Sequence, residues 1–174
     1  MLENFNLLGT SYRRFERKAC AELGYLLGQA GDPEARVSRT DISGVIVAKT
    51  LLDPFDVIKK LREILIERPY EFRYLLRVIP IERVVKTDMT EIVSVTRELA
   101  SRIEENETFR VTVEKRFTEV SGNAIIKAVA SDIKRKVNLS NPDKIVLIEI
   151  VGGFVGISVV KKSDIISVLK EKVL

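Results

Sequence analysis

Residues 108–160 read TFRVTVEKRFTEVSGNAIIKAVASDIKRKVNLSNPDKIVLIEIVGGFVGISVV, and this stretch decides the fold of the second half of the chain. Apolar and polar side chains alternate over 109–113, which is typical of a half-buried strand. Apolar residues then recur at helical spacing over about 122–137. Two apolar runs separated by Gly152-Gly153 predict buried strands joined by a tight turn. We therefore expect the strands 109–113 and 145–151 to lie parallel, connected by a right-handed helical crossover, and the last strand to return antiparallel.

The predicted helix has a basic side and begins near two cations. Its buried stripe comprises Ile125, Ile126, Val129, Ile133 and Val137. Its opposite side carries Lys127, Ser131, Lys134 and Arg135. Lys115 and Arg116 end the preceding strand, and Ser121-Gly122-Asn123 can open the helix with unpaired N–H groups facing outward. A helix start beside two cations suits a phosphate group.

These motifs resemble the THUMP domain, the RNA-binding module found in several tRNA-modifying proteins. The resemblance runs from about Thr87 to Val160. It is carried by Lys115-Arg116, Ser121, the string VNLSNPD at 137–143, Ile148-Glu149-Ile150 and Gly156-Ile157-Ser158. One departure is Asn138, where the family more often has Asp, although Asn can serve the same local capping role. Another is the short link 116–121, which leaves less loop for contact with RNA.

The N-terminal half follows the order β-α-β-β-α-β, which is typical of a ferredoxin-like unit. The expected elements are strand 7–10, helix 12–29, strands 35–40 and 44–49, helix 54–69 and strand 72–79. Asp53-Pro54 marks the second helix start, and Asp88 caps a later helix that runs to about Glu105. The sequence thus predicts an α+β protein with a ferredoxin-like unit over 1–86 and a THUMP-type α/β sheet with helices over 87–174. THUMP domains are often preceded by such a unit, so the order supports the resemblance.

The amino-acid composition limits which classes of protein the chain can belong to and which kinds of binding site it can form. Hydrophobic residues make up 45% and charged residues 31%, which is typical of a folded domain. No apolar run is long enough to span a bilayer, and the N-terminus lacks the features of a signal peptide. The chain has no histidine, and its single cysteine, Cys20, cannot form an internal disulfide or a cysteine metal cluster. We therefore expect no metal site, no cofactor, no membrane association and a cytoplasmic location.

Charge is sorted along the second half of the chain. Residues 88–107 carry two cations and six anions, whereas residues 108–136 carry seven cations and three anions. This pattern favours a basic surface over scattered charges. The candidate RNA-binding residues are Arg110, Lys115, Arg116, Ser121, Asn123, Lys127, Lys134 and Arg135. We expect the cations at 115, 116, 127, 134 and 135 to form one basic face, although each is equally well explained as a solvated surface charge.

Three further charged residues have two interpretations each. Glu149 lies within the apolar run IVLIEIV, where a structural ion pair or a strand-end position is favoured over catalysis because no acid/base partner can be named. Arg73 and Arg77, four residues apart, either face RNA from one side of a strand or pair with acids such as Glu71 and Glu82.

The resemblance implies a non-catalytic tRNA-binding adaptor, similar to the tRNA cytidine-acetylation adaptor group. Such a protein presents tRNA to a separate RNA acetyltransferase or another tRNA-modifying enzyme. Two alternatives stay open. One is a small enzyme that acts on a phosphorylated molecule through Glu149 or a main-chain anion hole. The other is a ligand-sensing α/β module.

Overall fold

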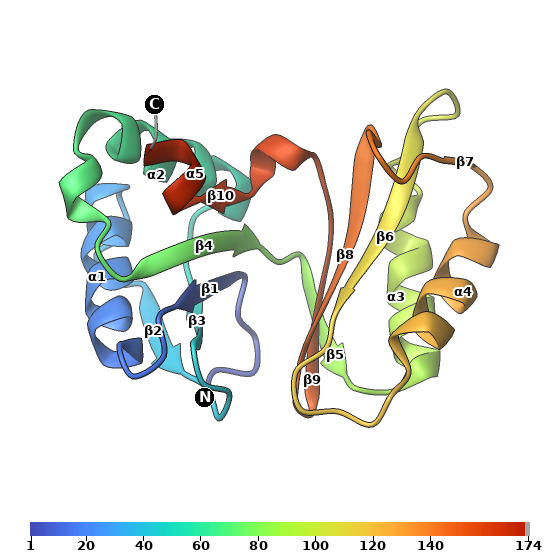
Figure 1. Ribbon diagram of the computed structural model, residues 1–174, viewed down its shortest axis with the longest axis horizontal. Helices are drawn as coiled ribbons and strands as arrows, with labels where there is room; N and C mark the ends of the chain where they lie inside the picture. The colour runs from blue at the N-terminus through green and yellow to red at the C-terminus, as the bar shows by residue number, and fades with distance from the viewer. Residues whose placement is uncertain (173–174) are drawn as a thin grey trace. The chain divides into compact units, whose positions relative to one another are not determined.

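The computed structural model describes residues 1–172, which form two compact units (Figure 1). The first comprises residues 1–81 with the C-terminal segment from Asp164 onward, and the second comprises Glu82–Ser163. Each unit contains one five-stranded sheet and its own helices. The predicted α+β class is confirmed.

The first unit has the predicted ferredoxin-like order. Its strands are β1 (Leu7–Ser11), β2 (Arg36–Arg39), β3 (Val45–Lys49), β4 (Leu75–Pro80) and β10 (Ile166–Ser167). Its helices are α1 (Glu16–Gln29), α2 (Pro54–Glu67), the 3-10 turn η1 (Pro69–Glu71) and α5 (Val168–Lys172). The strand order is β10-β4-β1-β3-β2, and every pair is antiparallel. The apolar sides of α1 and α2 form one core with the strand residues that face them (Figure 1).

The two helix starts of this unit differ in how well local sequence predicts them. The Asp53 carboxylate accepts hydrogen bonds from the backbone N–H groups of Phe55 and Asp56, so the predicted cap of α2 is confirmed. Helix α1 begins at Glu16 rather than at Tyr12. Arg14 has a φ of 73°, in the left-handed region, and a right-handed helix cannot pass through that residue.

The C-terminal segment returns to the first unit. Strand β10 pairs with β4, and Ile166 and Val168 are buried in the core of this unit. The Arg62 guanidinium on α2 lies 2.6 Å from the Glu171 carboxylate. The sequence-based division had placed residues 164–174 with the second unit, because no local pattern shows which sheet a two-residue strand joins.

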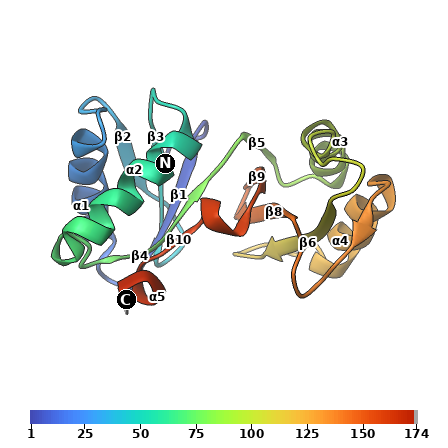
Figure 2. The same cartoon turned by 90° about the horizontal axis from the view of Figure 1, so that it is seen from above.

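The second unit is a mixed sheet with two helices on one face (Figure 2). Its strands are β5 (Arg83–Lys86), β6 (Thr108–Glu114), β7 (Lys136–Val137), β8 (Lys144–Val151) and β9 (Phe154–Val160), in the order β5-β9-β8-β6-β7. Its helices are α3 (Met89–Ala100) and α4 (Gly122–Asp132), followed by the 3-10 turn η2 (Lys162–Asp164). Strands β6 and β8 are parallel and β8 and β9 antiparallel, as predicted. Strand β5, which precedes α3 and which the sequence analysis did not predict, pairs with β9.

Both helices of this unit are shorter than predicted. Helix α3 ends at Ala100 instead of about Glu105, and α4 ends at Asp132 instead of about Val137. Ile133 has extended backbone angles, and Val137 pairs with β6. Val137 is therefore 49% exposed rather than part of the buried stripe. The apolar spacing continued past the helix end, but sheet pairing overrode it.

Candidate nucleic-acid interface

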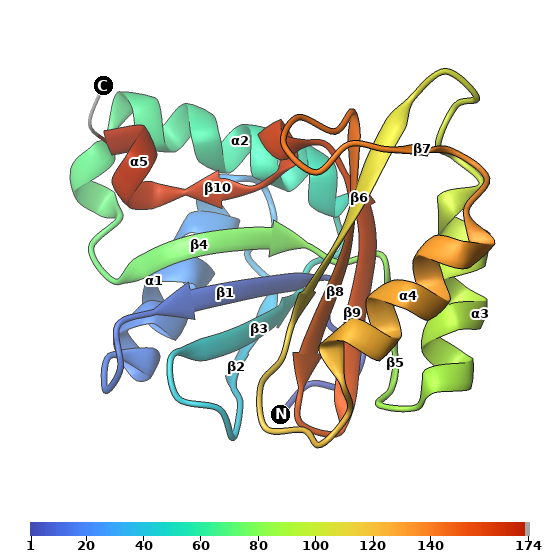
Figure 3. The ribbon, with the colours of Figure 1, turned by 45° about the vertical axis from the view of Figure 1, so that its right-hand side comes forward.

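The eight candidate RNA-binding residues lie in three places on the second unit. Lys115, Ser121, Asn123 and Lys127 lie around the start of α4, whereas Lys134 and Arg135 follow its C-terminal end. An 11-residue helix is about 16 Å long, which separates these two groups. Figure 3 shows the loop from β6 leading into one end of α4 and β7 following the other end. Arg110 and Arg116 belong to the third place, the sheet face away from the helices.

The start of α4 combines a cap, a cation and exposed backbone. Ser121 Oγ accepts a hydrogen bond from the backbone N–H of Ala124, so Ser121 is the predicted N-cap. The stem of Lys115 lies against Gly122, where an added Cβ would come within 3.3 Å of Lys115 Cδ. Lys115 is exposed and forms no ion pair with any described residue. Asn123 and Lys127, four residues apart, extend this surface along one exposed side of α4.

Phe117 is the residue of this site that the sequence analysis missed. Its side chain is 88% exposed, and its φ of 58° lies in the left-handed region. This conformation is costly for a non-glycine residue, and such residues concentrate at functional sites. Phe117 lines a surface groove of about 500 Å³ with Lys115, Thr118 and Glu119. The sequence did contain a signal for Phe117, namely an aromatic residue in a short loop beside a cation. Such a ring can stack on a nucleic-acid base.

The loop that carries Phe117 is fixed to the sheet through its backbone. The Arg116 carbonyl accepts a hydrogen bond of 2.9 Å from the N–H of Gly152, in the turn between β8 and β9. Thr118 Oγ1 accepts a hydrogen bond from the N–H of Val120. The first bond ties the loop to the sheet and the second lies within the loop, and Phe117, which lies between them, is exposed.

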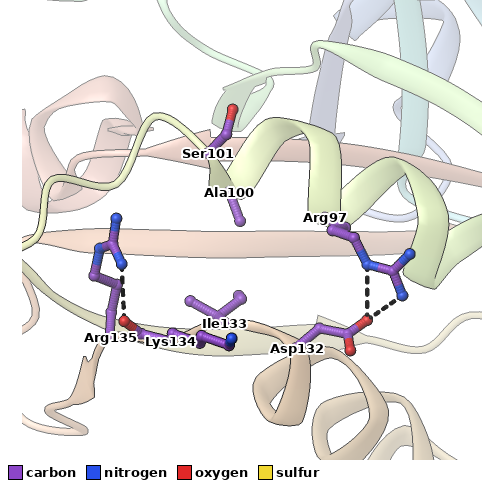
Figure 4. A pocket seen from close by; sticks show the side chains of 7 residues that line it. All are labelled: Arg97, Ala100, Ser101, Asp132, Ile133, Lys134 and Arg135. Carbon is purple, nitrogen blue, oxygen red and sulfur yellow. Dashed lines mark hydrogen bonds and ion pairs between the residues drawn. The ribbon is translucent and has the colours of Figure 1, made fainter.

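The residues after α4 line a separate groove of about 210 Å³ (Figure 4). The Arg135 guanidinium donates hydrogen bonds to the backbone carbonyls of Ile103, Glu104 and Lys134 at 2.8–3.0 Å. Across the groove, Arg97 forms an ion pair of 2.7 Å with Asp132. Arg135 thus satisfies carbonyl groups beyond the end of α3, a structural role that the sequence pattern did not reveal.

Arg110 and Arg116 face away from the helices and have partners in the chain. Phe109 lies in the helix-side core, so strand pleating directs Arg110 to the other face of the sheet. There Arg110 donates a hydrogen bond to the Leu139 carbonyl. Arg116 forms an ion pair of 2.7 Å with Glu149, whose side chain is only 1% exposed. The structure therefore does not join Lys115 and Arg116 into one basic face.

The ion pair with Arg116 is the structural role that the sequence analysis favoured for Glu149. The family-like segment 138–143 is also structural. Asn138 Oδ1 accepts hydrogen bonds from the backbone N–H groups of Ser140 and Asn141, which confirms its capping role. Asp143 accepts hydrogen bonds from the Thr108 N–H and hydroxyl, and these bonds hold the pKa of Asp143 below its ordinary value.

Within the described residues, 1–172, no helix has both the length and the apolar character needed to cross a membrane. No group of three or more histidine, cysteine, aspartate or glutamate residues there is arranged to hold a metal ion.

Comparison with known proteins identifies the second unit. Residues 86–160 match the family model of the THUMP domain. No curated protein sequence matches the chain significantly.

Solved structures share the fold at low sequence identity. PH1313 from Pyrococcus horikoshii Ot3 is 19% identical with a TM-score of 0.65, over 91% of this chain and 55% of that protein. TrmN from Thermus thermophilus is 13% identical with a TM-score of 0.56, over 88% of this chain and 44% of that protein. A 4-thiouridine synthetase in complex with RNA and ATP is 14% identical with a TM-score of 0.57, over 90% of this chain and 42% of that protein.

The chain spans about half the length of these structures, and the likeness concerns the fold. The sequence match is more specific than the structural likeness. It begins at the last residue of β5 and covers strands β6 to β9 with both helices of the second unit. The chain therefore contains a THUMP domain, which occupies residues 86–160.

Proposed function

We propose that this protein binds tRNA and presents it to a separate modification enzyme, in the most specific form of the proposal a cytidine acetyltransferase. The observation that carries the RNA-binding part is that two residues line one groove at the start of α4: exposed Phe117, and Lys115, which forms no ion pair with any described residue. Two comparisons support it. Residues 86–160 match the THUMP domain, the RNA-binding module that the sequence motifs resemble. One protein of similar fold was solved as a complex with RNA.

The chemistry of the site suits a backbone phosphate next to an unstacked base. Lys115 provides a flexible point charge, and its stem lies against Gly122 in the first turn of α4, where a helix start favours an anion. The Phe117 ring offers a face on which a base of any identity can stack. These contacts carry little sequence information, so the site recognises RNA without selecting one tRNA sequence.

The non-catalytic part of the proposal rests on side-chain chemistry. The chain has no histidine, the commonest general acid or base. Glu149, the one carboxylate considered for catalysis, is held by Arg116. Incubating the protein alone with unmodified tRNA and acetyl donor, followed by mass spectrometry of the nucleosides, tests this part. A modified nucleoside formed without another enzyme would overturn the adaptor proposal.

RNA binding is tested by gel shift of tRNA at two salt concentrations. Lys115→Glu and Phe117→Ala should each weaken binding to different tRNAs to a similar extent. Lys115→Glu should also reduce the slope of log affinity against log salt by about 0.7, the value for one phosphate on a single strand. Lys59→Glu, at an exposed position on α2, is the matched control for the charge change. Equal affinity of the wild type and both site variants would refute this interface.

A further inference from the structure

The first unit contains an aromatic groove that the THUMP domain match does not cover. The groove has a volume of about 480 Å³. Its lining residues come from α1 and from the segment that leads from α2 into β4, two stretches that Figure 1 shows side by side. One wall comes from α1 and the other from η1 and the residues that follow it. It is lined by Lys18, Ala21, Glu22, Tyr25, Tyr70, Glu71, Arg73 and Tyr74.

The groove exposes two tyrosine rings. Tyr25 is 50% exposed and Tyr70 is 65% exposed. The Tyr25 hydroxyl donates a hydrogen bond of 2.9 Å to Glu71, and this bond is the main reason that the pKa of Tyr25 is raised. The bond anchors the far end of the ring, so less conformational freedom is lost when a ligand packs on it.

A stacked aromatic pair lies beside the groove, because Tyr74, one of the lining residues, packs against Phe15. The rings of Phe15 and Tyr74 are stacked with centroids 5.4 Å apart and an interplanar angle of 17°. Lys18 Nζ lies 5.5 Å from the Phe15 centroid and 5.4 Å from the Tyr74 centroid. Because Lys18 also lines the groove, this packing holds a positive charge at its surface.

Two exposed cations, Lys18 and Arg73, line the groove and form no ion pair with any described residue. The carboxylates of the groove are already occupied. Glu71 binds Arg68 at 3.0 Å, and Glu22 accepts hydrogen bonds from the backbone N–H groups of Arg73, Tyr74 and Leu75. Lys18 and Arg73 are therefore the cations of the groove that remain available to phosphate groups.

We propose that this groove binds a single-stranded segment of RNA, with bases stacked on Tyr25 and Tyr70 and phosphates beside Lys18 and Arg73. Exposed rings interleaved with unpaired cations are the combination that binds single-stranded nucleic acid without sequence preference. The inference rests on the proposed function for the nature of the ligand. It adds a second contact surface in the first unit, distinct from the β6–α4 loop.

The affinity test uses a fluorescein-labelled uridine hexanucleotide, with fluorescence anisotropy as the readout. Tyr25→Ala with Tyr70→Ala should weaken binding about tenfold or more, because each alanine removes a stacking surface. Tyr25→Phe with Tyr70→Phe keeps both rings and should bind within about twofold of the wild type. Tyr12→Ala, which removes a tyrosine outside the groove lining, should leave the affinity unchanged. Far-UV circular dichroism verifies that each variant is folded.

Tyrosine fluorescence locates the binding to one unit. All four tyrosines lie in the first unit, and the chain has no tryptophan. The hexanucleotide should quench the tyrosine emission of the wild type. The Lys115→Glu/Phe117→Ala variant should retain this quenching, because neither residue lies in the first unit.

The outcomes separate the inference from the proposed function. Wild-type binding of tRNA, together with unchanged hexanucleotide affinity in the double alanine variant, would overturn the groove alone. Failure of the wild type to bind either RNA would overturn the proposed function as well. If the double alanine variant kept its RNA affinity and lost binding to a protein partner, the groove would be a protein-docking site instead.

Discussion

Arg116 and Glu149, 33 residues apart in the sequence, form an ion pair of 2.7 Å on the face of the THUMP sheet that points away from its helices. Glu149 is 1% exposed at its side chain and Arg116 is 15% exposed, so the arginine neutralises a carboxylate that has almost no contact with solvent. This relationship gives two adjacent cations, Lys115 and Arg116, different tasks. Both residues follow the end of β6, and Lys115 lies against Gly122 at the start of α4 instead of binding Glu149.

Arg116→Met should therefore destabilise the protein. Removing one partner of a buried pair leaves an uncompensated charge, which costs about 3–5 kcal/mol of unfolding free energy. The double variant Arg116→Met/Glu149→Leu should recover most of this loss, because neither charge remains buried. Urea denaturation of the three proteins measures the effect. If Arg116→Met were as stable as the wild type but bound tRNA more weakly, Arg116 would be a phosphate ligand rather than a structural partner.

Phe117→Gly should lower the affinity for RNA and relieve the backbone strain at this position. Phe117 occupies the left-handed region at φ 58°, which glycine adopts without steric cost, and its exposed ring contributes no core packing. The glycine variant should be more stable than Phe117→Ala by about 1 kcal/mol, because alanine retains the strain. Both variants lose the ring and should bind tRNA equally weakly. Thermal unfolding and gel shift give the two readouts, and equal stability of the two variants would mean that the loop is not strained.

Arg135→Ala should lower the stability of the protein, whereas Lys134→Ala should leave it unchanged. The Arg135 guanidinium bridges three backbone carbonyls after α3 and α4, and the loss of these charge-assisted bonds should cost about 1–3 kcal/mol. Arg135→Lys should restore little, because an ammonium group lacks the planar fork. Hydrogen exchange at residues 101–107 reports the expected loosening. Unchanged exchange in Arg135→Ala would show that these bonds contribute nothing.

Asp32→Asn should give a stability loss that depends on pH. The buried Asp32 carboxylate accepts hydrogen bonds from Thr50 Oγ1 at 2.6 Å and from the Leu51 N–H at 2.8 Å, which hold its pKa below the ordinary value. A lowered folded-state pKa stabilises the protein above the unfolded-state value of about 3.9, and this contribution disappears as the pH falls through the folded-state pKa. The variant should be about 1–2 kcal/mol less stable between pH 5 and 7, from the weakened hydrogen bonds.

Denaturation at several pH values checks this window. The difference between the wild type and Asp32→Asn should be constant between pH 5 and 7 and should shrink below about pH 4. A difference that changes between pH 5 and 7 would assign the effect to another group.

Local patterns were sufficient for most elements and for some of the site. The Asp53 and Ser121 caps lie within three residues of the N–H groups that they accept from, so their roles follow from the sequence nearby. Alternation over β6 and apolar runs over β8 and β9 likewise predicted the strands and their directions. The helix ends at 100 and 132 were missed because pairing and loop contacts decided them, rather than the spacing of apolar residues.

The sequence by itself determined the β-α-β-β-α-β order of residues 7–80, the order of the second unit apart from the short strands β5 and β7, the THUMP resemblance and the start of α4 as a candidate phosphate site. Only the tertiary structure decided which cations are available there. Arg116 is taken by Glu149 and Arg135 by backbone carbonyls, whereas Lys115 remains exposed beside Phe117. The Glu22 carboxylate accepts hydrogen bonds from backbone N–H groups that lie 51 to 53 positions later in the chain, and these bonds shape the aromatic groove. Periodicity and capping are short-range properties of the chain, but the partner of a charged side chain depends on which distant segments the fold brings within a few ångströms.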